Sequence, residues 1–320
     1  MKAQENLVPN GSFEEYSECP VDNELNNGQF ERAIGWFRPT FGTPDYFHRC
    51  NYDINVFNTV GVPENFWGYQ DAFHGDAYAG FVPLAWNNDG SFNGAEYIRT
   101  KLASPLTPCT IYHYRMYVSL ANVSTHGIGK IGAWFSVDNV TFPDEVPIIV
   151  EPHVAFQGDP IVDTSNWTLV EGTFVAEGFE EYLTIGYFHD NVQNDTTFVQ
   201  DNQFYNASYY YVDSVSLIEI GAVSENLCDL GEIVFPNVIT PNNDNNNDYV
   251  DASSYFIITD EIAIMNRWGN LIAVLTQDSP VWDGTNQQGV RCAEGSYFYS
   301  FSYKWGAQTK SKNGFIQLVR

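Results

Sequence analysis

Residues 110–120 read TIYHYRMYVSL, and the fold prediction starts from this stretch. Apolar side chains occupy alternate positions at Tyr114, Met116, Val118 and Leu120, the two-residue period of a strand with one buried face. Helical periodicity is scarce elsewhere. Comparable β-branched and aromatic runs, bounded by Gly, Pro, Asn and Asp, lie at 130–137, 167–176, 182–188 and 209–220. Many short strands separated by turn residues predict an all-β protein made of sandwiches.

The composition indicates a well-packed but strongly acidic protein. Of the 320 residues, 44% are hydrophobic and 16% aromatic, which is enough for a core and argues against disorder. The net charge of -26 repels nucleic acid and anionic membranes, so we expect neither as a partner. Residues 233–320 hold six basic and eight acidic residues, so nearly all of the excess lies before them. This asymmetry predicts a domain boundary near residue 230.

No apolar run is long enough to span a membrane, and no signal peptide is visible. Strand-like sequence begins within the first residues, MKAQENLVPNGSF. We therefore expect a mature or recombinant start, with any signal peptide already removed.

Five cysteines occur, and none forms a CxxC pair, which makes a zinc site improbable. Cys19 and Cys50 both lie in loop-like sequence, and Cys228 and Cys292 lie toward opposite ends of the C-terminal segment. We predict disulfides Cys19–Cys50 and Cys228–Cys292 with Cys109 left over. Five buried thiols are the alternative, because spacing cannot fix connectivity.

Catalytic motifs are missing from the N-terminal segment, residues 1–222. There is no HExxH and no GxSxG motif. Asp71, His74 and Asp76 lie close together in the sequence, but a hydrolytic or metal site would need a further residue that the sequence does not identify. We assign no catalytic residue and expect a protein that is not an enzyme.

Sugar sites combine exposed aromatic faces with polar groups. The loop LAWNNDGSFNG (84–94) offers Trp86 beside Asn87, Asn88 and Asp89, so these residues are the candidate ligand-binding set.

Two pieces of the N-terminal segment carry a resemblance. NLVPNGSFEE (6–15) and the strand YYYVDSVSLIEI (209–220) resemble the start and end of carbohydrate-binding jelly rolls of the galactose-binding-like superfamily. The resemblance implies neighbouring first and last strands, and a structural calcium ion held by Asn10, Glu14 and Asp213. A carboxylate satisfied by backbone N–H groups is the alternative. Longer pieces, such as 62–81 and 167–188, look like a jelly-roll module of secreted Bacteroidota proteins.

The C-terminal segment shows several motifs in a fixed order. FPNVITPN (235–242), NRWGN (266–270), WDG (282–284) and EGSYFY (294–299) are followed by a strand-like end, NGFIQLVR. Together they resemble the gliding-motility-associated C-terminal domain, the type B sorting domain of the type IX secretion system. About seven strands in this length suit a small Ig-like sandwich.

This resemblance completes the expected domain order. Residues 1–222 form a jelly-roll β-sandwich, 223–232 a linker, and 233–320 the Ig-like sorting domain. The resemblance implies export of the folded chain through the outer-membrane translocon of the type IX system. It leaves open whether the domain is then cleaved. The basic end of the last strand, Lys310, Lys312 and Arg320, is the candidate recognition element.

The turn after the first strand of this domain, PNNDNNND (241–248), holds Asp244, Asn246 and Asp248 at alternating positions as in calcium loops. It lacks the sixth-position Gly and the later Glu of an EF-hand, so a self-hydrogen-bonded Asx turn is the favoured alternative. Asn245 stands where the family usually has Gly, and Asn tolerates positive φ.

These observations predict a secreted or surface-displayed, non-catalytic protein of a Gram-negative, Bacteroidota-type bacterium. Its N-terminal module would bind a glycan or a surface partner. A self-assembling structural subunit, such as a filament, sheath or adhesin component, is the alternative, and a hydrolase of unknown type is a lesser one.

Overall fold

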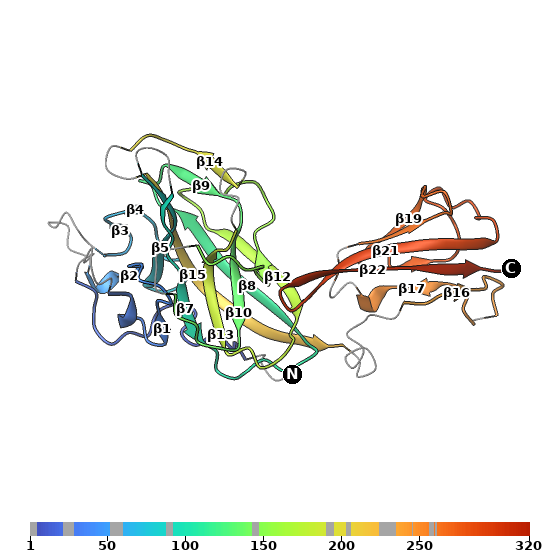
Figure 1. The fold of residues 1–320 in the computed structure, drawn as a ribbon, viewed down its shortest axis with the longest axis horizontal. Coiled ribbons are helices and arrows are strands. Elements are labelled where there is room, and N and C mark those ends of the chain that lie inside the picture. Colours follow the sequence, from blue (N-terminus) through green and yellow to red (C-terminus); the bar gives the residue numbers. More distant parts are fainter. Residues whose placement is uncertain are drawn as a thin grey trace. The chain divides into compact units, whose positions relative to one another are not determined.

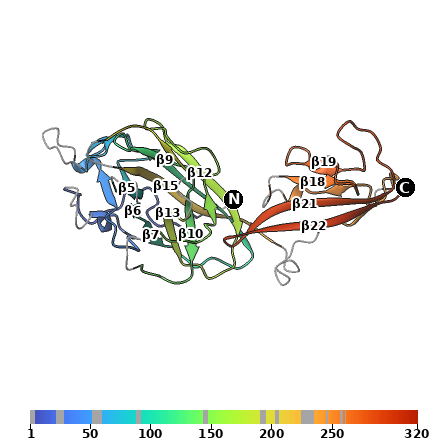
Figure 2. The same ribbon diagram turned by 45° about the horizontal axis from the view of Figure 1, so that its top comes forward.

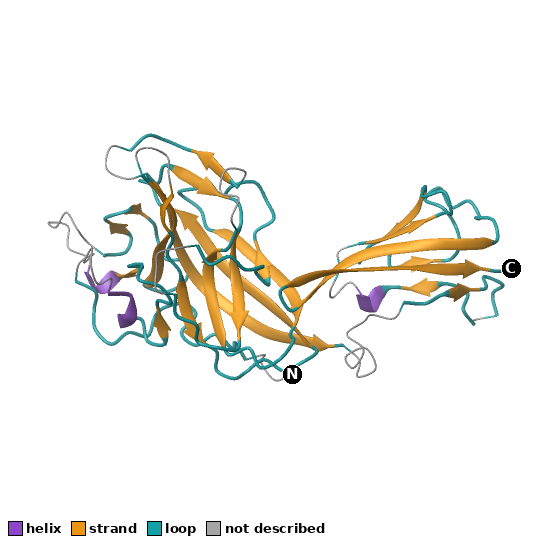
Figure 3. Ribbon diagram, in the orientation of Figure 1, coloured by secondary structure: helices purple, strands orange, loops and turns teal. Residues whose placement is uncertain are grey.

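The computed structural model describes residues 5–21, 29–51, 60–87, 92–142, 147–189, 195–202, 206–223, 235–244, 246–255, 259 and 261–320. Strands dominate this part of the chain, as predicted (Figure 3). Its helical segments are short 3₁₀ turns at Gln29–Arg32, Arg49–Asn51 and Ser253–Tyr255. The protein is therefore nearly all-β.

The chain divides into two compact units, here called the N-terminal and C-terminal domains (Figure 1). The second unit comprises residues 221–320 together with the short segments 108–111 and 173–176. The predicted linker, apart from Val223, falls outside the described residues.

Two sheets build the N-terminal domain as a jelly-roll β-sandwich. The first runs β1-β7-β13-β10-β11 and the second β12-β8-β15-β5-β2, with β6 beside β5. In the first sheet the strands are β1 (Trp36–Phe37), β7 (Ile98–Lys101), β13 (Tyr182–Tyr187), β10 (Ile131–Ser136) and β11 (Val154–Ala155). In the second they are β12 (Thr168–Val175), β8 (Thr110–Leu120), β15 (Ala207–Ala222), β5 (Ala77–Trp86), β2 (Asp45–His48) and β6 (Phe92–Gly94). Small ribbons pair β3 (Glu64–Asn65) with β4 (Gly68–Tyr69), and β9 (His126–Ile128) with β14 (Thr196–Phe198).

The alternation predicted for 110–120 is confirmed in β8, where successive side chains point in turn into the core and to the outer face of the sheet. Tyr114, Met116 and Val118 are fully buried, and the ring of Tyr114 lies edge-on to Phe135 of the other sheet, 5.8 Å between centroids. The intervening residues His113, Arg115 and Tyr117 are partly or fully exposed. The second sheet thus has an outer face where β8 carries polar and aromatic side chains.

The start of the chain lies along the end of β15, as the resemblance implied. Asn6 binds this strand twice, because Leu217 N donates to its Oδ1 and its Nδ2 donates to Val215 O. A Cβ on Gly11 would come 2.0 Å from Val215 O, so only glycine fits this close approach. β15 is therefore tied both to its sheet neighbours and to the N-terminal segment.

The C-terminal domain is a small Ig-like sandwich. One sheet contains β16 (Val238–Ile239), β22 (Gln308–Leu318) and β21 (Gly295–Trp305), and β18 (Ile262–Met265) joins β21 to β19 (Leu271–Leu275). A two-stranded sheet pairs β17 (Val250–Asp251) with β20 (Val281–Trp282). β21 and β22 form a long hairpin, visible in Figure 2. Alternate rings of β21 point into the core, where Tyr299 and Phe301 pack on Phe235 and Tyr297 packs on Trp282.

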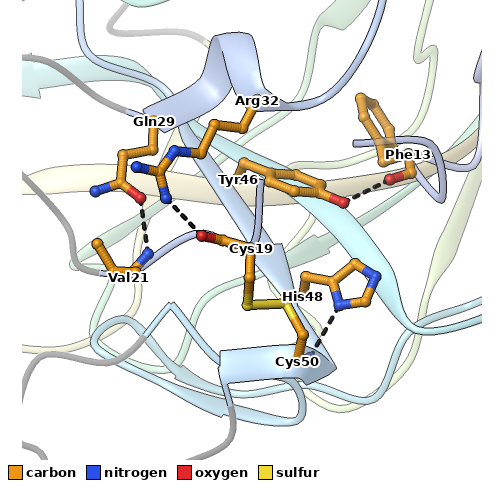
Figure 4. Close-up of a disulfide and its surroundings, with 8 residues drawn as sticks. All are labelled: Phe13, Cys19, Val21, Gln29, Arg32, Tyr46, His48 and Cys50. Carbon is orange, nitrogen blue, oxygen red and sulfur yellow. Dashed lines mark hydrogen bonds between the residues drawn. A yellow bond between two sulfur atoms is a disulfide. The ribbon is translucent and has the colours of Figure 1, made fainter. Parts of the chain in front are cut away.

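One predicted disulfide is confirmed and the other is wrong. Cys19 and Cys50 are bonded across 31 residues, next to a hydrogen bond from Cys50 N to His48 Nδ1 (Figure 4). Cys292 is a free thiol, and Cys109, expected to be left over, is disulfide-bonded. Cys228 lies outside the described residues. Val223 N donates to Cys109 O, so the chain passes Cys109 as it enters the segment 224–234, a meeting that sequence spacing does not reveal.

Two carboxyl groups near the edge of the second sheet, Asp45 of β2 and Glu96 of the segment between β6 and β7, influence each other electrostatically. Asp45 Oδ2 accepts hydrogen bonds from Trp67 Nε1 and Tyr209 OH, and burial raises the pKa of Asp45 to about 6. Glu96 accepts from the N–H groups of Thr43 and Val82, and burial, with the charge of Asp45, raises its pKa to about 7. Because the folded state favours the neutral acids, their stabilisation is complete below about pH 4 and is lost as pH rises through these pKa values.

We predict that Asp45→Asn stabilises the protein at pH 8 and reduces the gain in stability on acidification from pH 8 to pH 5. Both donors bind the same oxygen of Asp45, so an amide oxygen can accept both bonds while the buried charge disappears. The change in unfolding free energy at pH 8 should be about 1–3 kcal/mol. Denaturant titrations at the two pH values measure it, with the exposed Asp71→Asn as the control. An unchanged pH dependence in Asp45→Asn would contradict the buried-acid assignment.

Candidate functional site

A loop at residues 60–76 packs on buried tyrosines of β5 and β15 in the second sheet. Buried phenols bind it: Tyr211 OH donates to Asn65 Oδ1, Asn65 Nδ2 donates to Tyr78 OH, and Tyr78 OH donates to Gln70 O. The ring of Trp67 stacks on Tyr209 at 4.0 Å. Each buried hydroxyl thus has a partner, and the loop is part of the packed structure.

Beside this loop lies an open region that we call the β8 face. It consists of Phe73 from the loop, His113, Arg115 and Tyr117 from β8, and Trp167 and Glu171 from the region of β12. Phe73 stacks on Tyr117 with 3.7 Å between centroids and 17° between planes, and Trp167 meets Phe73 edge-on. Phe73 is 44% exposed, and Tyr117 and Trp167 are half-buried. The cluster therefore presents aromatic surface to solvent.

Polar groups border these rings. His113 Nε2 lies 3.0 Å from Glu171 Oε2, and Arg115 Nε donates to Ser216 Oγ at 3.0 Å. Trp167 Nε1 donates to Asp71 O, which fixes the orientation of the indole. Hydrogen-bond donors and acceptors thus stand next to exposed aromatic rings, the combination typical of sites for polyhydroxylated ligands.

Two carboxylates hold the segment 73–77 that supplies Phe73. Asp213 Oδ2 accepts from His74 N at 2.9 Å, and its other oxygen accepts from Ser214 N. Glu14 Oε1 accepts from the N–H groups of Asp76 and Ala77. Burial raises the pKa of Asp213 to about 7 against the opposing effect of these N–H donors, and the charge of Glu14 raises it further.

Gly75 is required in this segment. Its φ is +75°, and a Cβ there would lie 2.3 Å from Glu14 Oε1. The segment therefore combines left-handed backbone with close approach to a carboxylate.

The predicted calcium set is only partly brought together. Glu14 and Asp213 meet at segment 73–77, whereas Asn10 binds Glu15 and the carbonyl of Ile34 instead. The carboxylate oxygens face backbone N–H groups, as in the alternative stated from the sequence. In the described part of the chain, no group of three or more His, Cys, Asp or Glu gathers to hold a metal. Calcium here stays a prediction, and the melting temperature in calcium against chelator tests it.

The turn at 241–248 is held by its own side chains. Asp248 Oδ1 accepts from Asn242 N and Asn243 N, and Asp244 Oδ1 accepts from Asn246 N. The amide of Asn242, followed by the N–H of Asn246, lowers the pKa of Asp244. These are Asx-turn bonds, and calcium at Asp244, Asn246 and Asp248 remains a prediction. Asn243 and Asn247 have positive φ, whereas Asn245 lies outside the described residues.

The structure describes the predicted ligand loop, 84–94, at residues 84–87 and 92–94. Trp86 ends β5 and packs on His126 at 4.7 Å, and His126 in turn meets the exposed ring of Phe198. Asn87 is exposed, while Asn88 and Asp89 lie outside the described residues. Trp86 therefore belongs to a second, smaller aromatic cluster.

The three basic residues predicted for recognition have different surroundings. Arg320 is used within its own domain, because its guanidinium donates to the carbonyls of Cys292 and Gly284 and its N–H to Glu294. Lys310 Nζ lies 5.1 Å from the ring centre of Trp305, and Lys312 is half-buried.

Sequence reasoning did not find the β8 face. Its residues come from positions 73, 113–117 and 167–171, which only the sheet order and the covering loop bring together. His113, Arg115 and Tyr117 do occupy the outward phase of the alternating strand at 110–120. Their outward-facing positions in this strand are the sequence feature that could have identified them.

Several solved structures resemble this chain in fold. The CBM22-1–GH10 modules of endo-1,4-β-D-xylanase 10B from Clostridium thermocellum, complexed with xylohexaose, are 11% identical with a TM-score of 0.31. The match covers 71% of this chain and 33% of that one, so the present chain spans about a third of that relative's length. A CBM4 is 11% identical, with a TM-score of 0.29 and coverage of 67% of this chain and 99% of that one. The active domain of bacteriophage CBA120 tailspike protein 4 is 12% identical, with a TM-score of 0.27 and coverage of 65% and 22%. At these identities the likeness concerns fold alone.

No curated protein matches the chain. Among the described residues, none of the helical segments has the length and apolar character that a membrane crossing needs.

The C-terminal domain gives a more specific result. Residues 233–318 match the family model of the CHU_C type IX secretion signal domain, in agreement with the motifs at 235–242, 266–270, 282–284 and 294–299. This part of the chain therefore carries a type IX secretion signal, which implies export to the cell surface or beyond it.

Proposed function

We propose that the exported protein binds a glycan through the β8 face of its N-terminal domain and does not act on it as an enzyme. The observation that carries the proposal is the exposed stack of Phe73 on Tyr117, with Trp167 beside it. The sorting domain delivers the protein, and the jelly roll recognises its ligand at the surface or in the medium.

The chemistry of the β8 face suits a pyranose ring. The apolar C–H face of a sugar can lie on Phe73 or Trp167, while its hydroxyls reach the His113–Glu171 pair and Arg115. Arg115 and Glu171 are exposed, so they can exchange water for a sugar hydroxyl without first being uncovered. The acidic charge of the protein favours a neutral or cationic glycan over an anionic one.

A non-catalytic role is supported by the sequence, which contains neither HExxH nor GxSxG. The three acids whose pKa is raised most, Asp45, Glu96 and Asp213, accept hydrogen bonds from groups of their own domain, which supports a structural role for them.

We predict that Phe73→Ala and Tyr117→Ala each weaken glycan binding at least tenfold, because each removes half of the stacked pair, and tenfold corresponds to about 1.4 kcal/mol. A glycan array identifies the ligand, and titration calorimetry measures the affinities. Phe41→Ala removes a ring that is 66% exposed elsewhere in the same domain and should leave affinity unchanged.

The variant Trp86→Ala tests which of the two aromatic clusters binds the glycan. Binding that is lost in Trp86→Ala but retained in Phe73→Ala and Tyr117→Ala would move the site to the loop at 84–94. Regular polymers of the purified protein, with no bound glycan, would instead favour the structural-subunit alternative.

A further inference from the structure

The outer face of the main sheet of the C-terminal domain carries an apolar row. Phe298 of β21 lies opposite Phe315 of β22, Met265 of β18 lies opposite Phe298, and Leu271 of β19 lies opposite Met265. Phe298 and Phe315 are 45% and 52% exposed, and Leu271 is also exposed. Four neighbouring strands thus align apolar side chains on the solvent side, whereas the core side of β21 already has Tyr297, Tyr299 and Phe301.

The surroundings of this row on the hairpin carry no charge. Ser296 pairs with Gln317, Ser300 lies opposite Asn313, and Ser302 lies within 3.4 Å of Ser311. The solvent-facing side of an antiparallel sheet normally carries polar side chains rather than a row of apolar ones. An uncharged, partly aromatic sheet face in a protein of net charge -26 therefore suggests a surface that a partner covers.

A further exposed ring, that of Trp268, lies in the turn that joins β18 to β19. Trp268 is 76% exposed, in the turn between β18 and β19, and the guanidinium of Arg267 lies 5.3 Å from its ring centre. Asn266 Oδ1 accepts from Trp268 N and Asn270 N, so the turn is rigidly built. Tryptophan and arginine are frequent among the residues that dominate binding energy at interfaces.

We propose that the face formed by Leu271, Met265, Phe298 and Phe315, with Trp268 at its edge, docks on an uncharged apolar surface of the type IX export machinery. The proposal rests on the export function, because the whole face lies inside the matched range 233–318. A second copy of the chain is the less suitable occupant, since association would bring together two chains that each carry a net charge of -26.

The basic residues first expected to mediate recognition fit this role less well. Arg320 is engaged by Cys292, Gly284 and Glu294 of its own domain. The apolar face, by contrast, has exposed side chains whose removal leaves the inward-facing rings in place. Recognition of the folded domain would then depend on sheet shape and apolar contact more than on charge.

Export of the full-length chain in a bacterium with a type IX system tests the proposal. The double variant Phe298→Ser/Phe315→Ser should lower the extracellular protein at least tenfold and raise the cell-associated fraction, with the melting curve of the purified variant showing that it folds. Ser300→Glu keeps both rings but places a charge on the face, and should have the same effect. Val290→Ser removes an equally exposed apolar side chain, 60% exposed, from a turn of the same domain and should be exported normally.

Deletion of residues 233–320 separates this proposal from the export function on which it rests. Normal export of the deletion would overturn the export function itself. Blocked export of the deletion, with normal export of folded Phe298→Ser/Phe315→Ser and Ser300→Glu, would overturn the docking face alone. Sedimentation adds an independent outcome, because a dimer of the wild type that the double variant abolishes would assign the face to a second copy and contradict the proposal.

Discussion

The hydrogen bonds that backbone N–H groups of residues 73–77 donate to Asp213 and Glu14 position the segment that supplies Phe73 to the β8 face. Asp213 comes from the central strand β15 and Glu14 from the N-terminal segment, which is itself bound to the end of β15. Together they fix Phe73 against Tyr117 and anchor the loop that covers Tyr78, Tyr209 and Tyr211. A buried charge at Asp213 is costly, which the raised pKa reflects, but it satisfies backbone donors that would otherwise be unpaired.

The two domains use their surfaces differently. The N-terminal domain holds nearly all of the negative charge and presents aromatic rings bordered by polar groups, suited to a hydroxyl-rich ligand. The C-terminal domain is almost neutral, and its exposed sheet face carries an apolar row whose neighbours on the hairpin are uncharged polar side chains. Export and ligand binding would therefore depend on separate residues, and variants of one surface should leave the other function intact.

The sequence predicts local structure here better than it predicts contacts between residues that are distant in the chain. Alternation in 110–120 identifies β8 and even its outward side chains, and the motifs of the last domain identify the secretion signal. The predicted pairing of Cys228 with Cys292 is wrong because Cys292 is a free thiol, while Cys109, expected to be left over, is bonded. The β8 face likewise combines residues of the loop at 60–76, of β8 and of the region of β12, and no local sequence pattern predicts that these three segments lie side by side. Asp213 does stand out in the sequence as a charge in an apolar strand, although its N–H partners do not.

Hydrogen exchange of the His74 amide tests most directly whether the carboxylates of Asp213 and Glu14 position the β8 face. Asp213→Asn places an amide NH₂ where one carboxylate oxygen accepts from the backbone, whereas Asp45→Asn retains its single accepting oxygen. We predict that exchange at His74 becomes at least tenfold faster in Asp213→Asn and stays unchanged in Asp45→Asn. Unchanged protection of His74 in a folded Asp213→Asn protein would contradict it.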